Sequence, residues 1–362
     1  MFLRKNRKRD RQRAAAMLLI ICLLLAGCGN KPAEQPAPPS ETGPEEPPAV
    51  TEPAARQEPL ALRCALSVPY EHPKAQAMFQ MEEALEKSSA GLLRIDISTD
   101  GALAETDEAA LEKVINGQME MALVSSAALS TVAPDFAVFS VPFQIDSIDH
   151  LQRVLTSNDP VFTALNAETE TVGVSVLSAF ASLPTGFFLR DPAPEDPDAW
   201  SGLRIAVRDS ASCASLSAAG AVLLDLPESA VYPALMTGEL DGAEGDMLVW
   251  LQDMYYTVAQ YYVNISFRVL PDLLIVNSGT MEKLTDAEKQ MLHRLADEAA
   301  ASCYKETAAL TETLMEQAEE CGAVILKADL ASVRKLFTEE FRTMRENSPA
   351  AEALAVLLEN TR

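Results

Sequence analysis

The sequence of 362 residues has few of the residues and spacings with which enzymes hold metals, phosphates or nucleophiles. It contains three histidines, and they are far apart in the sequence. No pair of cysteines has the CxxC spacing of zinc and redox sites. The glycines form no phosphate-binding loop, and no GxSxG motif occurs. We therefore expect a protein that is not an enzyme and that uses no metal or cofactor.

Basic residues are scarce outside the N-terminus. The chain has 29 Lys and Arg against 53 Asp and Glu, a formal net charge of −24, and seven of the basic residues fall within residues 1–13. Proteins that bind nucleic acid present basic surfaces to the phosphates, so nucleic acid is not an expected partner. The acidic excess favours cationic partners or solubility in an exposed compartment.

Long apolar runs are absent too, with one exception near the N-terminus. Residues 14–25 are uninterrupted apolar sequence, which is short for a membrane span of about 20 residues but suits the core of a signal peptide. The run ends in Leu25-Ala26-Gly27-Cys28, which resembles a bacterial lipoprotein lipobox. The resemblance implies a signal peptide over residues 1–27, acylation of Cys28 and a lipid anchor outside the cell membrane. An ordinary secretory signal is the alternative.

The remaining cysteines do not suggest a disulfide framework. Cys303 and Cys321 fall in one predicted helix, where 1.5 Å per residue separates them by about 27 Å, far beyond disulfide reach. We expect buried free thiols, with a Cys64–Cys213 bridge as the open alternative.

Residues 28–60 are expected to form a disordered tether. Nine of the chain's 22 prolines fall there, and Glu, Ala and Thr fill the gaps. Such a segment has little apolar surface to bury and stays extended. We assign it no role beyond holding the following domain away from the membrane.

From residue 61 onward, segments typical of strands alternate with segments typical of helices. Strands are predicted at 62–68, 93–97, 119–124, 172–177, 203–207 and 273–276, and helices from Pro73, at 105–116 and at 228–237. Thr285-Asp286-Ala287-Glu288 predicts a capping box at the start of a long helix that ends near Gly322. This alternation predicts an α/β architecture with a parallel sheet.

The length of the chain favours two domains. We expect domain I over 61–180 with a return segment near 266–300, and domain II over 181–265 with a C-terminal segment near 301–362. The long helix, about 54 Å at 1.5 Å per residue, exceeds what one small domain needs and is expected to span both.

A cleft between these domains is the expected place for a ligand. Open α/β sheets bind ligands at the carboxyl ends of their strands, and two such domains bring those ends together. Candidate residues at or just past predicted strand ends are Glu71, His72, Ser125, Ser126 and Arg208. They would suit a small hydrophilic solute.

Five segments, in the same order along the chain, resemble motifs of the solute-binding proteins of TRAP transporters, the DctP family. They are Gly101–Ala104 (GxLG), Val114–Ala122 ((L/V)xxGxLDMA), Val141–Phe143 (LPF), Pro197–Val207 (PxDLKGLKIRV) and Ala230–Glu244 (EVYxALQxGVVDGxE). The resemblance covers about Leu62 to Glu352. It implies a two-lobed periplasmic-binding-protein-like fold with an interdomain cleft, which closes around a solute and delivers it to a membrane permease. It also adds Tyr232 and Glu244 to the candidate ligand-binding residues.

The sequence departs from the family at the positions that bind a carboxylate. The family's arginine in the GLKIRV strand is Ala206 here, and its second arginine, in a GxR motif, is Phe188 if Gly186 is the motif's glycine. The asparagine after DGxE is Gly245. Loss of the main arginine removes about 1.5–3 kcal/mol of charge-assisted hydrogen bonding.

Two explanations stay open at this point. A neighbouring arginine has taken over: Arg208, two residues or about 7 Å along the strand, or Arg190. Alternatively the solute is neutral or cationic and is bound by polar side chains among Glu71, Ser125, Glu228, Tyr232 and Glu244.

The expected function is that of a solute-binding lipoprotein of a TRAP-type transporter. Its partners would be a small polar solute, in the first place an organic acid, the permease subunits, and the membrane through the N-terminal lipid. The alternative is a ligand-sensing or scaffolding lipoprotein that kept the fold without transport.

Overall fold

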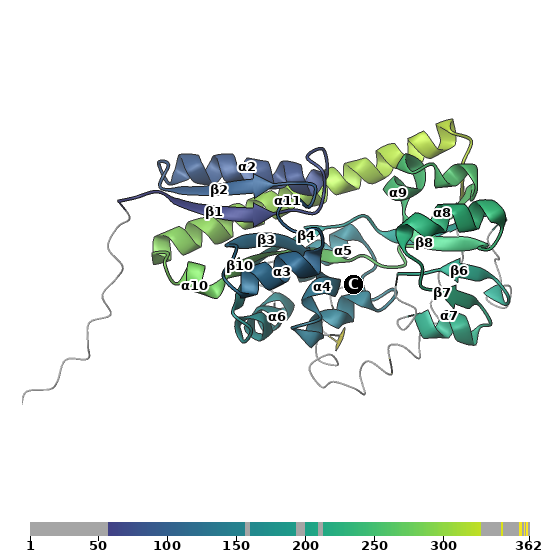
Figure 1. Cartoon of the computed structure of the whole chain (residues 1–362), viewed down its shortest axis with the longest axis horizontal. Helices are drawn as coiled ribbons and strands as arrows, with labels where there is room; N and C mark the ends of the chain where they lie inside the picture. The colour runs from purple at the N-terminus through teal and green to yellow at the C-terminus, as the bar shows by residue number, and fades with distance from the viewer. Residues whose placement is uncertain are drawn as a thin grey trace, which may run out of the picture. The chain divides into compact units, whose positions relative to one another are not determined.

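The computed structural model describes residues 57–155, 160–192, 200–208 and 213–326, together with residues 342, 355, 356, 358 and 360. The signal segment, the acylation site at Cys28 and nearly all of the tether lie outside these residues. The described strands form two sheets, and Figure 1 shows helices packed on both of them.

The first sheet has the strand order β2-β1-β3-β10-β4. Its strands are β1 (Leu60–Ala65), β2 (Leu93–Ser98), β3 (Met121–Ser125), β4 (Val174–Ala181) and β10 (Pro271–Asn277). β1 pairs in parallel with β2 and β3, whereas β10 runs antiparallel to β3 and β4. Alternation in β1 and β2 places Leu62, Cys64, Leu93 and Ile95 in the core, as their pattern predicts.

The second sheet has the strand order β11-β9-β5-β8-β6-β7. Its strands are β5 (Thr185–Leu189), β6 (Arg204–Ala206), β7 (Val222–Leu224), β8 (Gly242–Asp246), β9 (Tyr261–Val263) and β11 (Val324–Leu326). β6 pairs in parallel with β7 and β8, whereas β5 is antiparallel to β8 and β9.

The prediction of a parallel sheet was therefore wrong, because both sheets are mixed. Two neighbouring strands can be parallel only if a crossover connection, usually a helix, joins them. Helices α2 (Pro73–Ser88) and α3 (Asp107–Ile115) provide these connections between β1, β2 and β3, which pair in parallel. Two connections have no helix: β4 of the first sheet leads directly to β5 of the second, and β9 of the second leads directly to β10 of the first. Each of β5 and β10 therefore enters its sheet from the other sheet, and each runs antiparallel to both of its neighbours. The α/β class and the two-sheet fold stand.

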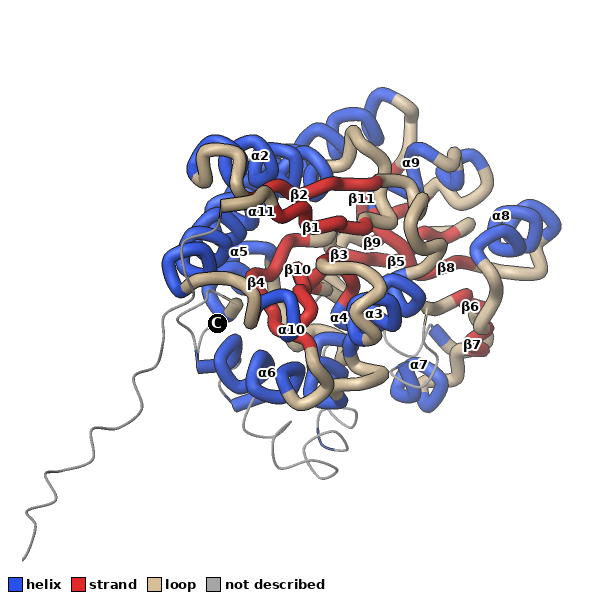
Figure 2. The backbone as a smooth tube through the Cα atoms, turned by 60° about the vertical axis from the view of Figure 1, so that its left-hand side comes forward, coloured by secondary structure: helices blue, strands red, loops and turns tan. Residues whose placement is uncertain are grey.

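Helices cover the two sheets, as Figure 2 shows in blue around the red strands. They are α2 (Pro73–Ser88), α3 (Asp107–Ile115), α4 (Ser126–Leu129), α5 (Ile148–Val154), α6 (Pro160–Glu170), α7 (Ala214–Ala218), α8 (Glu228–Thr237), α9 (Met247–Gln252), α10 (Ser278–Met281) and α11 (Asp286–Glu320), with 3-10 turns η2 (Pro134–Ser140) and η5 (Tyr255–Thr257). The predicted helix at 228–237 is confirmed as α8, which Gly238 ends with the positive φ of 76° that glycine adopts without strain.

The long helix begins at the predicted capping box. Thr285 Oγ1 accepts a hydrogen bond from the Glu288 N–H at 3.3 Å, and Glu288 Oε2 accepts one from the Thr285 N–H at 2.8 Å. α11 packs against α2 and β4 and, farther along, against α9 and β11 (Figure 1). It therefore contacts elements of both sheets, as predicted for a helix of this length.

Within the described residues up to 326, three segments connect the two sheets, and we call them the crossing segments: 182–184, 264–270 and α11. Segment 264–270 is hydrogen-bonded to the first residue of β5, directly after segment 182–184, because Thr185 N–H donates to the Arg268 carbonyl at 2.9 Å and Phe267 N–H donates to the Thr185 carbonyl at 2.7 Å. These bonds satisfy backbone groups that neither sheet pairs at this point.

Strand β5 divides the apolar core around the second sheet into two clusters. Phe187 packs with Trp200 and Phe267 on one face, whereas Phe188 packs with Trp250 and Tyr255 in the cluster on the other face. Alternate residues of a strand point to opposite faces, so one strand supplies both clusters. The cysteines at 64, 213, 303 and 321 form no disulfide, as predicted; the first three are buried, as predicted, whereas Cys321 is exposed.

None of the helices in the described part of the chain is both long and apolar enough to cross a membrane. α11 has the length, but charged residues recur along it.

Replacing Thr285 by Ala should lower the free energy of unfolding by about 1 kcal/mol, because the first turn of α11 loses its side-chain acceptor. Urea denaturation followed by circular dichroism measures this change. The matched control is Thr313→Ala, at an exposed position within the same helix, which should be neutral or slightly stabilising because Ala has the higher helix propensity. Equal losses in the two variants would contradict the capping role.

Candidate ligand-binding cleft

A cavity of about 610 Å³ lies where the carboxyl end of β3 approaches the second sheet. We call it the cleft. From the first sheet's side it is lined by Ser125, Ala127, Ser130 and Ser140, and from the second sheet by residues of β5, β6 and β8 and the residues that follow β6. Its volume lies within the range of small-molecule sites, which is roughly 300–1,000 Å³.

Ser125 is fixed at the cleft by its position between β3 and α4. Its N–H donates to Asp107 Oδ2 at 2.9 Å, and its Oγ accepts a hydrogen bond from Ala128 N–H at 3.3 Å as the N-cap of α4. Capping leaves the hydroxyl proton available for another acceptor. The strand therefore delivers a positioned hydroxyl group to the cleft.

A buried ion pair between Arg268 and Glu244 forms part of the cleft wall. Arg268 Nη1 lies 3.1 Å from Glu244 Oε1, and the two side chains are 3% and 0% exposed. Thr185 Oγ1 donates to Glu244 Oε1 at 3.2 Å, and the Arg208 N–H donates to Glu244 Oε2 at 3.3 Å. Both carboxylate oxygens are thus engaged, as a buried charge requires.

Sequence reasoning missed Arg268, although a signal for it exists. The residue stands in the run Ile265-Ser266-Phe267-Arg268-Val269-Leu270, where it is the only charged side chain. A charged residue inside an apolar run is either at a surface or buried with a partner. The sequence does not name the partner, because Glu244 is distant along the chain.

Arg208 extends from the end of β6 along the cleft with its side chain 54% exposed. Its Nη2 lies 4.0 Å from Asp246 Oδ2, the outer limit for an ion pair. Arg204, on the same strand, is instead held by two bonds to Asp241, at 2.9 Å from Nε and 2.8 Å from Nη2. These bonds lower the pKa of the Asp241 carboxyl. Arg208 therefore keeps a guanidinium group that a ligand can reach.

Apolar side chains form another part of the cleft lining, and we call this surface the apolar wall. It consists of Phe188, Leu226, Val231, Val249 and Tyr255. The Phe188 and Tyr255 rings lie 4.9 Å apart between centroids. Burial, followed by the charges of Glu228 and Asp253, raises the pKa of the Tyr255 hydroxyl, so this ring stays neutral.

The candidate residues Ser125, Arg208 and Glu244 line the cleft together, as does Glu228 of the alternative set. The other candidates do not line it. Glu71 is exposed beside α2, and Ser126 is fully buried in α4.

Neither Arg190 nor Tyr232 lines the cleft. The Arg190 guanidinium lies over Gly238 at the end of α8. The Tyr232 hydroxyl is 3.0 Å from Thr257 Oγ1, and its ring packs 5.6 Å from Tyr255. Tyr232 therefore supports the apolar wall from outside.

His72 is the N-cap of α2. Its Nδ1 accepts a hydrogen bond from Lys74 N–H at 3.2 Å. Burial, and after it the charge of Lys74, lowers the pKa of His72 from 6.5 to about 3. The ring therefore stays neutral and acts as a helix cap.

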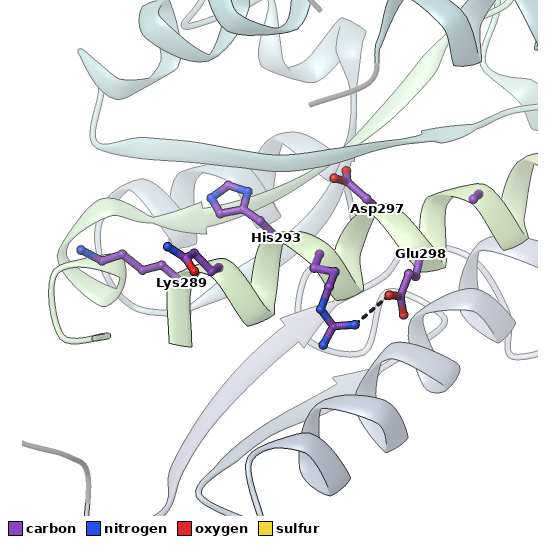
Figure 3. A pocket seen from close by; sticks show the side chains of 7 residues that line it. Lys289, His293, Asp297 and Glu298 are labelled. Carbon is purple, nitrogen blue, oxygen red and sulfur yellow. Dashed lines mark hydrogen bonds and ion pairs between the residues drawn. The ribbon is translucent and has the colours of Figure 1, made fainter. Parts of the chain in front are cut away.

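A second hollow, of about 580 Å³, follows one face of α11 (Figure 3). Lys289, His293, Asp297 and Glu298 belong to its lining, and Arg294 Nη1 donates to Glu298 Oε1 at 2.7 Å. Asp297 is tied to β4 by the Ser178 hydroxyl at 2.9 Å. None of the candidate ligand-binding residues lines this hollow.

The chain is similar to one protein family over most of its length and to individual solute-binding proteins. The model of the bacterial extracellular solute-binding proteins, family 7 (DctP), matches residues 64–347. A solute-binding protein of Chromohalobacter salexigens is 25% identical over 246 residues, which cover 67% of this chain and 71% of the relative.

Solved structures share the fold. A TRAP periplasmic solute-binding protein of Chromohalobacter salexigens with bound D-glucuronate has a TM-score of 0.74 at 20% identity and covers 83% of this chain and 100% of its own. A TRAP periplasmic solute-binding protein of Ochrobactrum anthropi, whose C-terminus is bound in its ligand-binding pocket, has a TM-score of 0.78 at 20% identity, covering 84% and 96%.

The cap formed by His72 predicts a pH dependence of stability. Below pH 6.5 the unfolded chain binds a proton on His72 that the folded chain does not bind, so stability falls as the pH is lowered toward 5. In His72→Asn, which keeps a capping side chain, the loss of unfolding free energy between pH 7 and 5 should be smaller by about 1–2 kcal/mol. Urea denaturation at each pH measures it. If the unfolding free energy of the two proteins fell by the same amount between pH 7 and 5, the prediction would be contradicted. Between pH 7 and 8 the unfolding free energies of the two proteins should change equally, which is the internal control.

Proposed function

Because the chain belongs to family 7 of the bacterial extracellular solute-binding proteins, the DctP family of TRAP transporter receptors, we propose that it captures a small organic acid outside the cell membrane and delivers it to a TRAP permease. The observation that carries the proposal is the cleft of about 610 Å³, lined from both sheets and containing the accessible guanidinium group of Arg208. The protein would bind and release its solute without changing it chemically.

The charges in the cleft favour an acid over a cation. Two glutamates and two arginines line it, but the Glu244 oxygens are already engaged by Arg268 and its neighbours. Glu228 is the first residue of α8, where the helix dipole stabilises a negative charge. The Arg208 guanidinium is more than half exposed and can form two parallel hydrogen bonds with a carboxylate.

The structural neighbour from Chromohalobacter salexigens gives further support, since it holds D-glucuronate, which is a carboxylate. In this chain Arg208 would take the place of the arginine that the family resemblance puts at Ala206. A guanidinium group at position 208 instead of 206 would explain how the chain binds an acid although Ala206 carries no charge.

Closure of the cleft would couple binding to delivery. The crossing segments are the connections about which the two sheets could rotate, and a solute contacting both sides stabilises the closed arrangement. Ser125 would contact the solute from the first sheet and Arg208 from the second. The permease would then recognise the closed form.

Replacing Arg208 by Ala should weaken the binding of the acid solute by about 10- to 100-fold, which corresponds to roughly 1.5–3 kcal/mol for hydrogen bonds to a charged group. The measurement is thermal-shift screening with organic acids, amino acids, sugars and polyamines, followed by titration calorimetry on each hit.

Arg294→Ala is the matched control, because Arg294 is exposed on α11 and does not line the cleft. Hits confined to neutral or cationic compounds would refute the acid solute. A panel without any hit would favour a non-transport lipoprotein that kept the fold.

The anchor is a separate part of the proposal: Cys28 would be acylated and hold the chain at the membrane. Cys28→Ser should abolish incorporation of labelled palmitate and release the protein into the soluble extracytoplasmic fraction. Cys64→Ser serves as the control, because Cys64 is buried in the first sheet. Incorporation that persists in the Cys28 variant would contradict acylation at this residue.

A further inference from the structure

We propose that the acid taken by the cleft has an apolar body, of which the aryl carboxylates are the simplest members, and that it is selected over polyhydroxylated sugar acids. The proposal rests on the proposed function, because it assumes a carboxylate bound by Arg208. It is carried by the apolar wall and by the small residues beside it.

The wall begins with a coupled pair of residues on β5 and β8. A Cβ atom added to Gly245 would lie 2.7 Å from Phe188 Cε1, closer than real contacts allow. The aromatic ring therefore fills the space that any side chain at position 245 would need. If Gly186 is the glycine of the family's GxR motif, the resemblance implies an arginine at 188 and an asparagine at 245, and one ring stands in place of both polar groups.

A row of residues across three strands continues from this ring. Phe188 pairs with Ala243, and Ala243 pairs with Ala206. Strands are spaced about 4.8 Å apart, so Phe188 and Ala206 are roughly 10 Å apart, and Arg208 follows two residues beyond Ala206. The two alanines contribute only methyl groups to the lining between the strand that carries Phe188 and the strand that leads to Arg208.

Two polar groups near the wall, the Tyr255 hydroxyl and the Glu244 carboxylate, already have partners within the protein. The Tyr255 hydroxyl donates to the Glu228 carbonyl at 3.5 Å, and the Glu244 oxygens accept from Arg268, Thr185 and Arg208. A sugar acid would place several hydroxyl groups against carbon atoms here, and buried hydroxyls without partners are unfavourable. A flat apolar body has no hydroxyl groups that would be left without partners, and its transfer from water to the apolar wall is favourable.

The test compares phenylacetate and D-glucuronate by titration calorimetry on the purified protein. Phenylacetate should bind at least tenfold more tightly. Equal or tighter binding of D-glucuronate would overturn the apolar-body proposal but leave the acid-binding function standing. If neither these two nor other carboxylates bind, the proposed function itself fails and this inference fails with it.

Phe188→Leu tests the wall directly and should weaken phenylacetate binding by about tenfold while changing D-glucuronate binding little. The matched control is Phe187→Leu. Phe187 is the next residue on β5, equally buried, but it faces Trp200 and Phe267 and does not line the cleft. It should leave both affinities unchanged, and equal effects of the two variants would overturn the proposal.

A second variant covers the case in which Phe188→Leu does not fold. Val231→Thr puts a hydroxyl group of nearly the same size into the wall from α8. Phenylacetate binding should weaken several-fold, and the ratio of its affinity to that of D-glucuronate should fall. An unchanged ratio would contradict contact between the solute body and the wall.

Discussion

The buried pair of Arg268 and Glu244 is the interaction on which the cleft depends. Arg268 belongs to a crossing segment and Glu244 to β8, so the pair attaches the connection between the sheets to the second sheet. Two charges removed from water are stable together, whereas one left alone would cost several kcal/mol. The pair therefore fixes where segment 264–270 lies, and that segment supplies Arg268 and Leu270 to the cleft.

The pair also determines which charges remain for a solute. Because Arg268 and Glu244 neutralise each other, Arg208 and Glu228 are the charged side chains of the lining that remain for a solute, and in our proposal the accessible guanidinium of Arg208 binds the acid. The carboxylate of Glu244 holds the Arg208 backbone N–H as well, so the same group that neutralises one arginine positions the next. Charge neutralisation and positioning of the binding group are thus parts of one network.

Local signals predicted much of the fold, and long-range pairing accounts for what they missed. The capping box at Thr285 and the end of α8 at Gly238 depend on a few neighbouring residues, so the sequence predicts them directly. The direction of β10 depends on the strand arriving from the other sheet, which no local pattern encodes. For the site, the ends of β3 and β6 brought Ser125 and Arg208 to the cleft. Arg268 escaped prediction because its partner is brought near only by the fold.

Capture of an anion by so acidic a chain is consistent with the range of electrostatic forces. The formal net charge is −24, but at physiological salt charges more than about 8 Å apart are largely screened. A solute in the cleft therefore responds mainly to the groups that line it, where two arginines balance two glutamates. In the proposed mode of binding, hydrogen bonds to Arg208 would orient the carboxylate, and the apolar wall would favour solutes whose remaining part carries few hydroxyl groups. Affinity for the acid group and selectivity for the rest of the solute would thus come from different residues of one cleft.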